Sequence, residues 1–102
     1  MNAYQFHPDA SAELNEIWEF IARDNEEAAD RTLNEIQSAI DMLVNNPFAG
    51  HTRTDLSSRT IRFWLVHSYL IAYIPNKPLT VLAILHGRRN PRIMAALLRD
   101  RK

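Results

Sequence analysis

The sequence predicts an α+β domain whose elements run in the order β-α-α-β-β-β-α. Apolar residues recur at helical spacing through the first 45 residues, and three runs of β-branched and aromatic residues follow between positions 61 and 85. The chain has 102 residues, 46% of them apolar, and only two glycines. This length suits one compact domain over residues 1–102, which buries about two thirds of its unfolded surface.

The N-terminal segment predicts a short strand and then a helix. The strand lies within the first seven residues, where apolar side chains stand among polar neighbours. Pro8 is preorganised for the first position of a helix, and Asp9 in the first turn complements the helix dipole. The helix carries one apolar stripe, made of Leu14, Ile17, Trp18 and Ile21. We expect this stripe, including Trp18, to face the core.

A second helix follows almost at once. Asn25 is a suitable N-cap, and Glu26 and Glu27 in the first turn suit the helix macrodipole. Its apolar positions keep helical spacing up to Asn45; they are Ala29, Leu33, Ile36, Ile40 and Leu43. Because the link between the two helices is short, the simplest packing is an antiparallel αα-hairpin.

A polar loop over residues 46–59 precedes a β-rich segment. Its three candidate strands are residues 61–66, 69–74 and 79–85. Short polar links separate them, which predicts an antiparallel meander that is apolar on both faces. One face is expected to pack on the αα-hairpin, and the other needs a cover, either the C-terminal segment or a partner protein. Phe63 and Trp64 point to opposite faces, so one of them belongs to the core, and the pattern leaves open which.

The charged residues are sorted by half. Residues 1–50 hold ten Asp or Glu and two Arg, whereas residues 51–102 hold ten Lys or Arg and two Asp. Pro91 opens a final helix with the apolar stripe Ile93, Met94, Leu97 and Leu98, while Arg92, Arg99 and Arg101 lie mostly off it. A basic helix directly after a buried strand indicates a surface that meets an anionic partner.

Composition excludes several kinds of site. The chain has no cysteine, so disulfides, thiolate metal sites and thiol catalysis are excluded. Its histidines, His7, His51, His67 and His86, are far apart and form no HExxH pattern, so we expect no metal and no cofactor. No apolar run approaches the ~20 residues that cross a bilayer, and no signal peptide is evident, which favours the cytoplasm. A net charge of zero favours association, which indicates a protein that is part of a complex.

Three short motifs bring a resemblance to a known family. They are Pro8 with IWEFIA at residues 17–22, NPFAG at residues 46–50, and LHGRRNP at residues 85–91. In this order and spacing, over essentially the whole chain, the sequence closely resembles the RelE/ParE family of type II toxins. The resemblance implies a bacterial toxin that is harmless in a hetero-oligomer with a ParD-like or similar antitoxin and arrests growth when released. It does not indicate which residues contact the antitoxin.

The family contains two mechanisms, and one of them is catalytic. RelE-like members cleave messenger RNA on the ribosome, which requires positioned cations and an acid/base. Arg88 or Arg89 matches the family's basic residue after the last strand. However, Tyr69 stands where a catalytic arginine would begin the middle strand, and Met94 stands near the place of the C-terminal tyrosine. A RelE-like endoribonuclease is therefore our alternative hypothesis.

ParE-like members resemble the chain better and are associated with poisoning of DNA gyrase, a binding activity that needs no catalytic residue in the toxin. We therefore predict a gyrase inhibitor rather than an enzyme. The predicted target-binding residues are Arg88, Arg89, Arg92, His86 and Arg99, and Arg101 and Lys102 extend this basic surface. Arginine suits bidentate contact with carboxylate or phosphate. A simpler interpretation is that some of these arginines pair with the acidic helices of the same molecule.

A small basic nucleic-acid-binding domain is the competing class outside the toxins. This class predicts an affinity for naked DNA or RNA that falls steeply as salt rises. The acidic half of the chain would repel a polyanion, and no helix-turn-helix or RNA-recognition signature is present. A DNA gel shift separates this class from the toxins.

Overall fold

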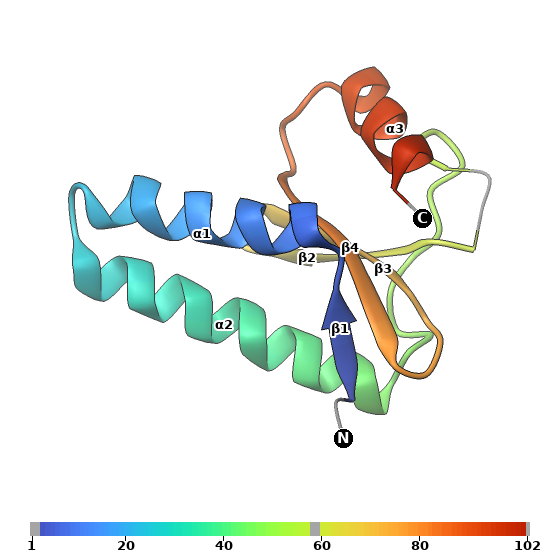
Figure 1. Ribbon diagram of the computed structural model, residues 1–102, viewed down its shortest axis with the longest axis horizontal. Coiled ribbons are helices and arrows are strands. Elements are labelled where there is room, and N and C mark those ends of the chain that lie inside the picture. Colours follow the sequence, from blue (N-terminus) through green and yellow to red (C-terminus); the bar gives the residue numbers. More distant parts are fainter. Residues whose placement is uncertain (1–2, 58–59, 102) are drawn as a thin grey trace.

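The computed structural model describes residues 3–57 and 60–101. Its elements are strand β1 (Tyr4–Phe6), helices α1 (Pro8–Ala22) and α2 (Glu26–Asn45), strands β2 (Arg62–Val66), β3 (Tyr69–Ile74) and β4 (Leu79–His86), and helix α3 (Pro91–Asp100). This is the α+β order predicted from the sequence (Figure 1).

All three helices begin where the sequence predicts. The side chain of His7 accepts a hydrogen bond from the backbone N–H of Asp9 at 3.1 Å, directly ahead of Pro8. Asn25 caps α2 by accepting from the N–H of Ala28 at 3.0 Å. Asn90, directly before Pro91, caps α3 by accepting from the N–H of Arg92 at 2.8 Å. These caps satisfy N–H groups that have no partner within their own helix, so each start is fixed locally.

The four strands form one sheet in the order β1-β4-β3-β2. The meander of β2, β3 and β4 is antiparallel, as predicted. β1 differs, because it pairs in parallel with β4, from Tyr4 opposite Leu79 to Phe6 opposite Val81. The predicted antiparallel meander is confirmed, and β1 extends it to a mixed sheet. A strand of three residues is too short for its sequence to indicate whether it pairs in parallel or antiparallel. The direction of β1 is set by the long connection from β1 to β4, which runs through both helices and the meander.

Helices cover both faces of the sheet (Figure 1). On one face, Ile36 and Ile40 of α2 belong to the same buried cluster as Ile71 and Tyr73 of β3. On the other face, α3 contributes to a second cluster, whose members include Met94, Leu98, Phe63, Leu70, Leu82 and Leu85. The C-terminal segment is thus the second cover. Phe63 is the fully buried one of the two neighbouring aromatics, while Trp64 is half-buried on the hairpin side.

Apolar burial holds α3 on the sheet. Met94 and Leu98 are each only 1% exposed. Full burial of such a side chain contributes about 1.5–3 kcal/mol, more than an exposed polar contact provides. Ile93 was predicted on the same stripe but is 53% exposed, because it lies at the N-terminal end of the helix beside the exposed link from β4.

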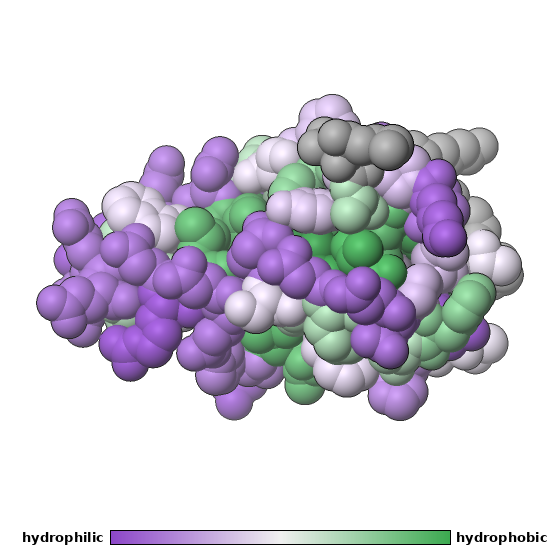
Figure 2. Space-filling view, turned by 90° about the horizontal axis from the view of Figure 1, so that it is seen from below, coloured by the Kyte–Doolittle hydropathy of each residue, from purple (hydrophilic) through white to green (hydrophobic). Residues whose placement is uncertain are grey.

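The apolar stripe of α1 meets the core over only part of its length. Leu14 and Ile17 pack against the hairpin-side cluster, but Trp18 is half-buried and lies outside both clusters. Its indole N–H donates to a carboxylate oxygen of Asp30 at 2.8 Å. The expectation that Trp18 is core is therefore wrong. The hairpin end projects past the sheet (Figure 1), and hydrophilic side chains crowd that end, at the left of Figure 2.

The loop after α2 is fastened to the sheet by Tyr73. The phenol is fully buried, donates to the carbonyl of Pro47 at 2.7 Å and accepts from the N–H of Gly50 at 2.9 Å. A Cβ at position 50 would lie 2.5 Å from the Tyr73 hydroxyl oxygen and 3.0 Å from the carbonyl of Phe63. Arg62 adds a hydrogen bond to the carbonyl of Gly50 at 2.8 Å. The glycine of the NPFAG motif is therefore required by a close approach rather than by an unusual backbone angle.

Replacing Tyr73 with phenylalanine is expected to lower the free energy of unfolding by about 1–3 kcal/mol, because the N–H of Gly50 and the carbonyl of Pro47 lose their partner. Urea unfolding followed by circular dichroism measures this change. Tyr69→Phe is the matched control, since Tyr69 is half-buried against the same cluster and its hydroxyl makes neither of the hydrogen bonds that hold the loop. Equal losses in the two variants would mean that the hydroxyl does not hold the loop.

Burial raises the pKa of Tyr73 above its ordinary value. The folded protein thus favours the neutral phenol, whose contribution to stability is complete below the unfolded pKa of about 10 and is lost as pH rises through the folded pKa. The stability advantage of the natural chain over Tyr73→Phe should therefore stay constant up to about pH 10 and shrink above it. Urea titrations across this range test the prediction. An advantage that grows with pH would contradict it.

Candidate functional site

A groove of about 680 Å³ lies between α1 and the end of β4. The wall formed by α1 includes Glu13, Glu16, Ile17, Glu19 and Phe20. The opposite wall includes Ile84, His86, Arg88 and Arg89. One wall is therefore acidic and the other basic, with apolar side chains on both.

The structure brings only part of the predicted target-binding set together. His86, Arg88 and Arg89 line the groove, whereas Arg92 and Arg99 lie on α3 and do not. All five residues are exposed. The predicted basic surface therefore has two parts, one at the groove and one on the last helix.

Backbone hydrogen bonds shape the turn that carries Arg88 and Arg89. The N–H of Gly87 donates to the carbonyl of Ser68 at 2.7 Å. The N–H of Arg88 donates to Nδ1 of His86 at 3.1 Å, and the N–H of Arg89 donates to the His86 carbonyl at 3.0 Å. The position of the turn therefore does not depend on the guanidinium groups, which extend from a shaped backbone.

His86 has a structural role in this arrangement. Its ring packs edge-on against Tyr69, with centroids 5.7 Å apart, and its Nδ1 is occupied as an acceptor. These contacts orient the imidazole and help to form the turn. They also place Nε2 as the ring nitrogen left for a ligand.

The arginines of the predicted surface differ in how they are paired. Among the described residues, the ion pairs that involve arginine are Arg53 with Asp55 and Arg101 with Asp9 and Glu13. None includes Arg88, Arg89, Arg92 or Arg99 within residues 3–57 and 60–101. These four guanidinium groups are therefore oriented by no acid of the described chain.

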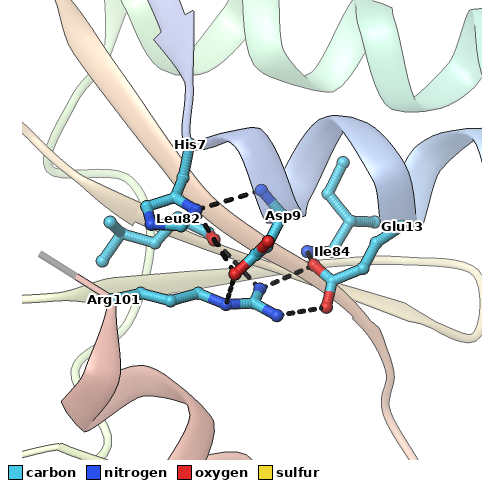
Figure 3. A network of polar contacts seen from close by, with 6 residues as sticks. All are labelled: His7, Asp9, Glu13, Leu82, Ile84 and Arg101. Carbon is cyan, nitrogen blue, oxygen red and sulfur yellow. Dashed lines mark hydrogen bonds and ion pairs between the residues drawn. The ribbon is translucent and has the colours of Figure 1, made fainter.

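Arg101 corrects the prediction for the C-terminal end. It was expected on the exposed basic surface, but it is only 6% exposed and binds the carboxylate of Glu13 through two hydrogen bonds of 2.8 Å (Figure 3). The hydrogen bonds to Glu13 raise the pKa of Arg101, and burial acts in the opposite direction. Lys102 lies outside the described residues.

Two positions bear on nuclease chemistry. Met94 lies on the side of α3 that faces the sheet, and its side chain is buried there, out of reach of an RNA. Tyr69 is half-buried against the hairpin-side cluster and against His86. Neither position supplies the cation or the exposed acid/base that the RelE-like mechanism requires there.

The described residues contain no group of three or more His, Cys, Asp or Glu side chains placed to hold a metal ion. In residues 3–57 and 60–101 no helix combines the length and apolar character needed to span a bilayer.

Sequence reasoning missed the α1 wall of the groove. Phe20 is 68% exposed there, beside Glu16 and Glu19. The available signal was that Phe20 lies off the apolar stripe of its helix, so a large aromatic ring was left on the polar face. Arg23, at the end of α1, also lines the groove.

A family model matches residues 4–91, from β1 to the first residue of α3, and it describes the ParE toxin of the parDE type II toxin-antitoxin system. The match covers the αα-hairpin, the meander and the turn with Arg88 and Arg89. A search of curated proteins finds no match. Over most of its length, this chain therefore belongs to the ParE toxin family of type II toxin–antitoxin systems.

Proposed function

We propose that this toxin arrests bacterial growth by binding and inhibiting DNA gyrase when it is free of its antitoxin. The observation that carries the proposal is the pair of exposed arginines, Arg88 and Arg89, on a rigidly shaped turn at the mouth of a groove. The proposal places the toxin in the cytoplasm, where gyrase acts on the chromosome.

The chemistry of the turn suits inhibition by binding. A guanidinium group presents donors in a planar fork that matches a carboxylate or a phosphate. Arg88 and Arg89 could therefore meet an acidic patch on gyrase or the phosphates of the DNA that gyrase holds. Because neither is held by an acid of the described chain, no internal ion pair has to be broken on binding.

A binding mechanism also fits the walls of the groove. Ile17 and Phe20 offer apolar surface between the charged rims. An apolar centre with charges at its edge is the usual organisation of a protein–protein interface. A RelE-like nuclease site would require an arginine at position 69 and a tyrosine near position 94, where this chain has a half-buried tyrosine and a buried methionine.

Membership of the family implies an antitoxin partner. We propose that the antitoxin forms a hetero-oligomer with this chain through a segment that folds on binding and covers exposed apolar side chains. An acidic part of the antitoxin would be attracted to the exposed arginines of α3, Arg92 and Arg99. Since ~1.4 kcal/mol is a tenfold change in affinity, several kilocalories per mole would silence the toxin.

The double variant Arg88→Ala/Arg89→Ala should abolish growth arrest, because it removes both guanidinium groups from the groove. Folding and binding of the co-expressed antitoxin should persist, since backbone atoms shape the turn. Colony counts after induction, thermal melting and co-purification measure the three properties. Arg31→Ala/Lys77→Ala is the charge-matched control, because both residues are exposed and lie outside the groove. Toxicity that survives in the first variant would place the active surface elsewhere.

The target is tested by inducing the toxin alone in bacteria and following labelled thymidine and labelled methionine within minutes. Inhibition of gyrase predicts that DNA synthesis falls first and that the double-strand-break response rises. If methionine incorporation stops first, the ribosomal endoribonuclease is correct and the gyrase proposal fails.

A further inference from the structure

The end of α3 is attached to α1 by an ion pair that also reaches the sheet (Figure 3). Nη1 and Nη2 of Arg101 donate to the two carboxylate oxygens of Glu13, each at 2.8 Å. Nη1 also donates to the carbonyl of Leu82 at 3.2 Å, and the carboxylate of Glu13 accepts from the N–H of Ile84 at 3.1 Å. Asp9 adds a second carboxylate, 3.6 Å from Nε of Arg101. One pair of side chains therefore joins three separate elements.

The Arg101–Glu13 pair lies beside the part of β4 that, among the described residues, has no neighbouring strand on the β1 side. β1 accompanies β4 only as far as Val81, where Phe6 is the last paired residue. The N–H of His7 then donates to the carbonyl of Val81 at 2.8 Å, and the chain turns into α1. Leu82 and Ile84 follow on β4 with polar groups directed to this open edge. Arg101 and Glu13 supply the acceptor and donor that a longer strand would have supplied.

The other attachments of α3 are of a different kind. Met94 and Leu98 hold the helix by apolar contact with the sheet. The link from Gly87 to Asn90 is exposed along its whole length. The family match also ends at residue 91, the first residue of α3.

We propose that α3 is a strap, that is, a helix that can detach from the sheet while the rest of the fold persists. The Arg101–Glu13 pair, here called the clasp, fastens the strap, and its opening also changes the groove that Glu13 lines. Opening the clasp releases the end of α3 and loosens the carboxylate that accepts from the N–H of Ile84. Glu13 and Ile84 both line the groove, so a change at α3 reaches the groove through a single carboxylate. The opened strap uncovers the second face of the sheet, which is apolar. The inference goes beyond the proposed function and does not depend on the identity of the target.

Charge and burial explain why the clasp controls the strap. Arg101 is buried, so breaking its pair with Glu13 removes the nearer of the two carboxylates, Glu13 and Asp9, that compensate its charge, which is strongly unfavourable. The loss of Glu13 therefore favours movement of Arg101 into solvent, and α3 must move with it. Arg99, two residues earlier, is exposed and takes part in no ion pair of the described chain, so its charge exerts no such pull.

Hydrogen exchange of the purified toxin tests the proposal residue by residue. In Arg101→Gln, the amides of residues 95–100 and of Ile84 should exchange at least about tenfold faster, since a buried ion pair has lost one partner. The amide of Ile40, in the hairpin-side core, should not change. Arg99→Gln is the matched control, with the same change of charge on the same helix, and it should exchange like the natural chain.

Variants of Glu13 separate the strap from its effect on the groove. Glu13→Gln removes the charge that binds Arg101 but keeps an oxygen for the N–H of Ile84, whereas Glu13→Ala removes both. Exchange in residues 95–100 should accelerate in both variants, and exchange at Ile84 should accelerate more in Glu13→Ala. Both variants should also increase fluorescence of the apolar dye ANS, because the sheet face is uncovered.

Two outcomes would overturn the proposal. Unchanged exchange in residues 95–100 in Arg101→Gln and Glu13→Gln would show that apolar contacts alone hold α3. Equal acceleration of all amides, Ile40 included, would show that the pair stabilises the whole fold and controls no separate strap.

Discussion

Two-sided burial of the central strands is the constraint on which the rest of this structure depends. Alternate residues of β3 enter the two hydrophobic clusters, with Ile71 and Tyr73 facing the αα-hairpin and Leu70 and Ala72 facing α3. A sheet of this kind needs a cover on each face. The chain must therefore pass from one face to the other after its last strand. The turn with Arg88 and Arg89 lies at that crossing, beside α1, which is why the basic residues border a groove.

Burial also divides the arginines into two kinds. A guanidinium group can leave water only where a charge and hydrogen-bond acceptors await it. Arg101 meets these conditions, since Glu13 and the carbonyl of Leu82 both accept from it. Arg88 and Arg89 remain in solvent, where an ion pair with an acid of α1 would contribute little. In the described part of the chain, the segregation of charge is therefore kept on the surface, and Arg101 with Glu13 neutralises opposite charges in the interior.

The loop after α2 shows how a short motif acquires its residues. The NPFAG turn contributes a carbonyl and an N–H to one buried phenol, that of Tyr73, and leaves no space for a side chain at Gly50. This attachment joins the helical half of the chain to the meander. It belongs to the matched part of the family, as does the turn after β4, whereas residues 92–101 continue beyond the match.

Local sequence was enough for the helix starts, the three antiparallel strands and the order of elements, because caps, proline positions and apolar spacing act over a few residues. It also identified the turn with Arg88 and Arg89. The helical spacing of apolar residues did not predict the exposure of Trp18 and Ile93, since burial depends on how far the sheet extends beneath each helix. The parallel pairing of β1, the pairing of Glu13 with Arg101 across 88 positions, and the acidic wall opposite the arginines were decided by tertiary packing. In each case the partners are distant in sequence, so no pattern over a few residues could indicate their contact.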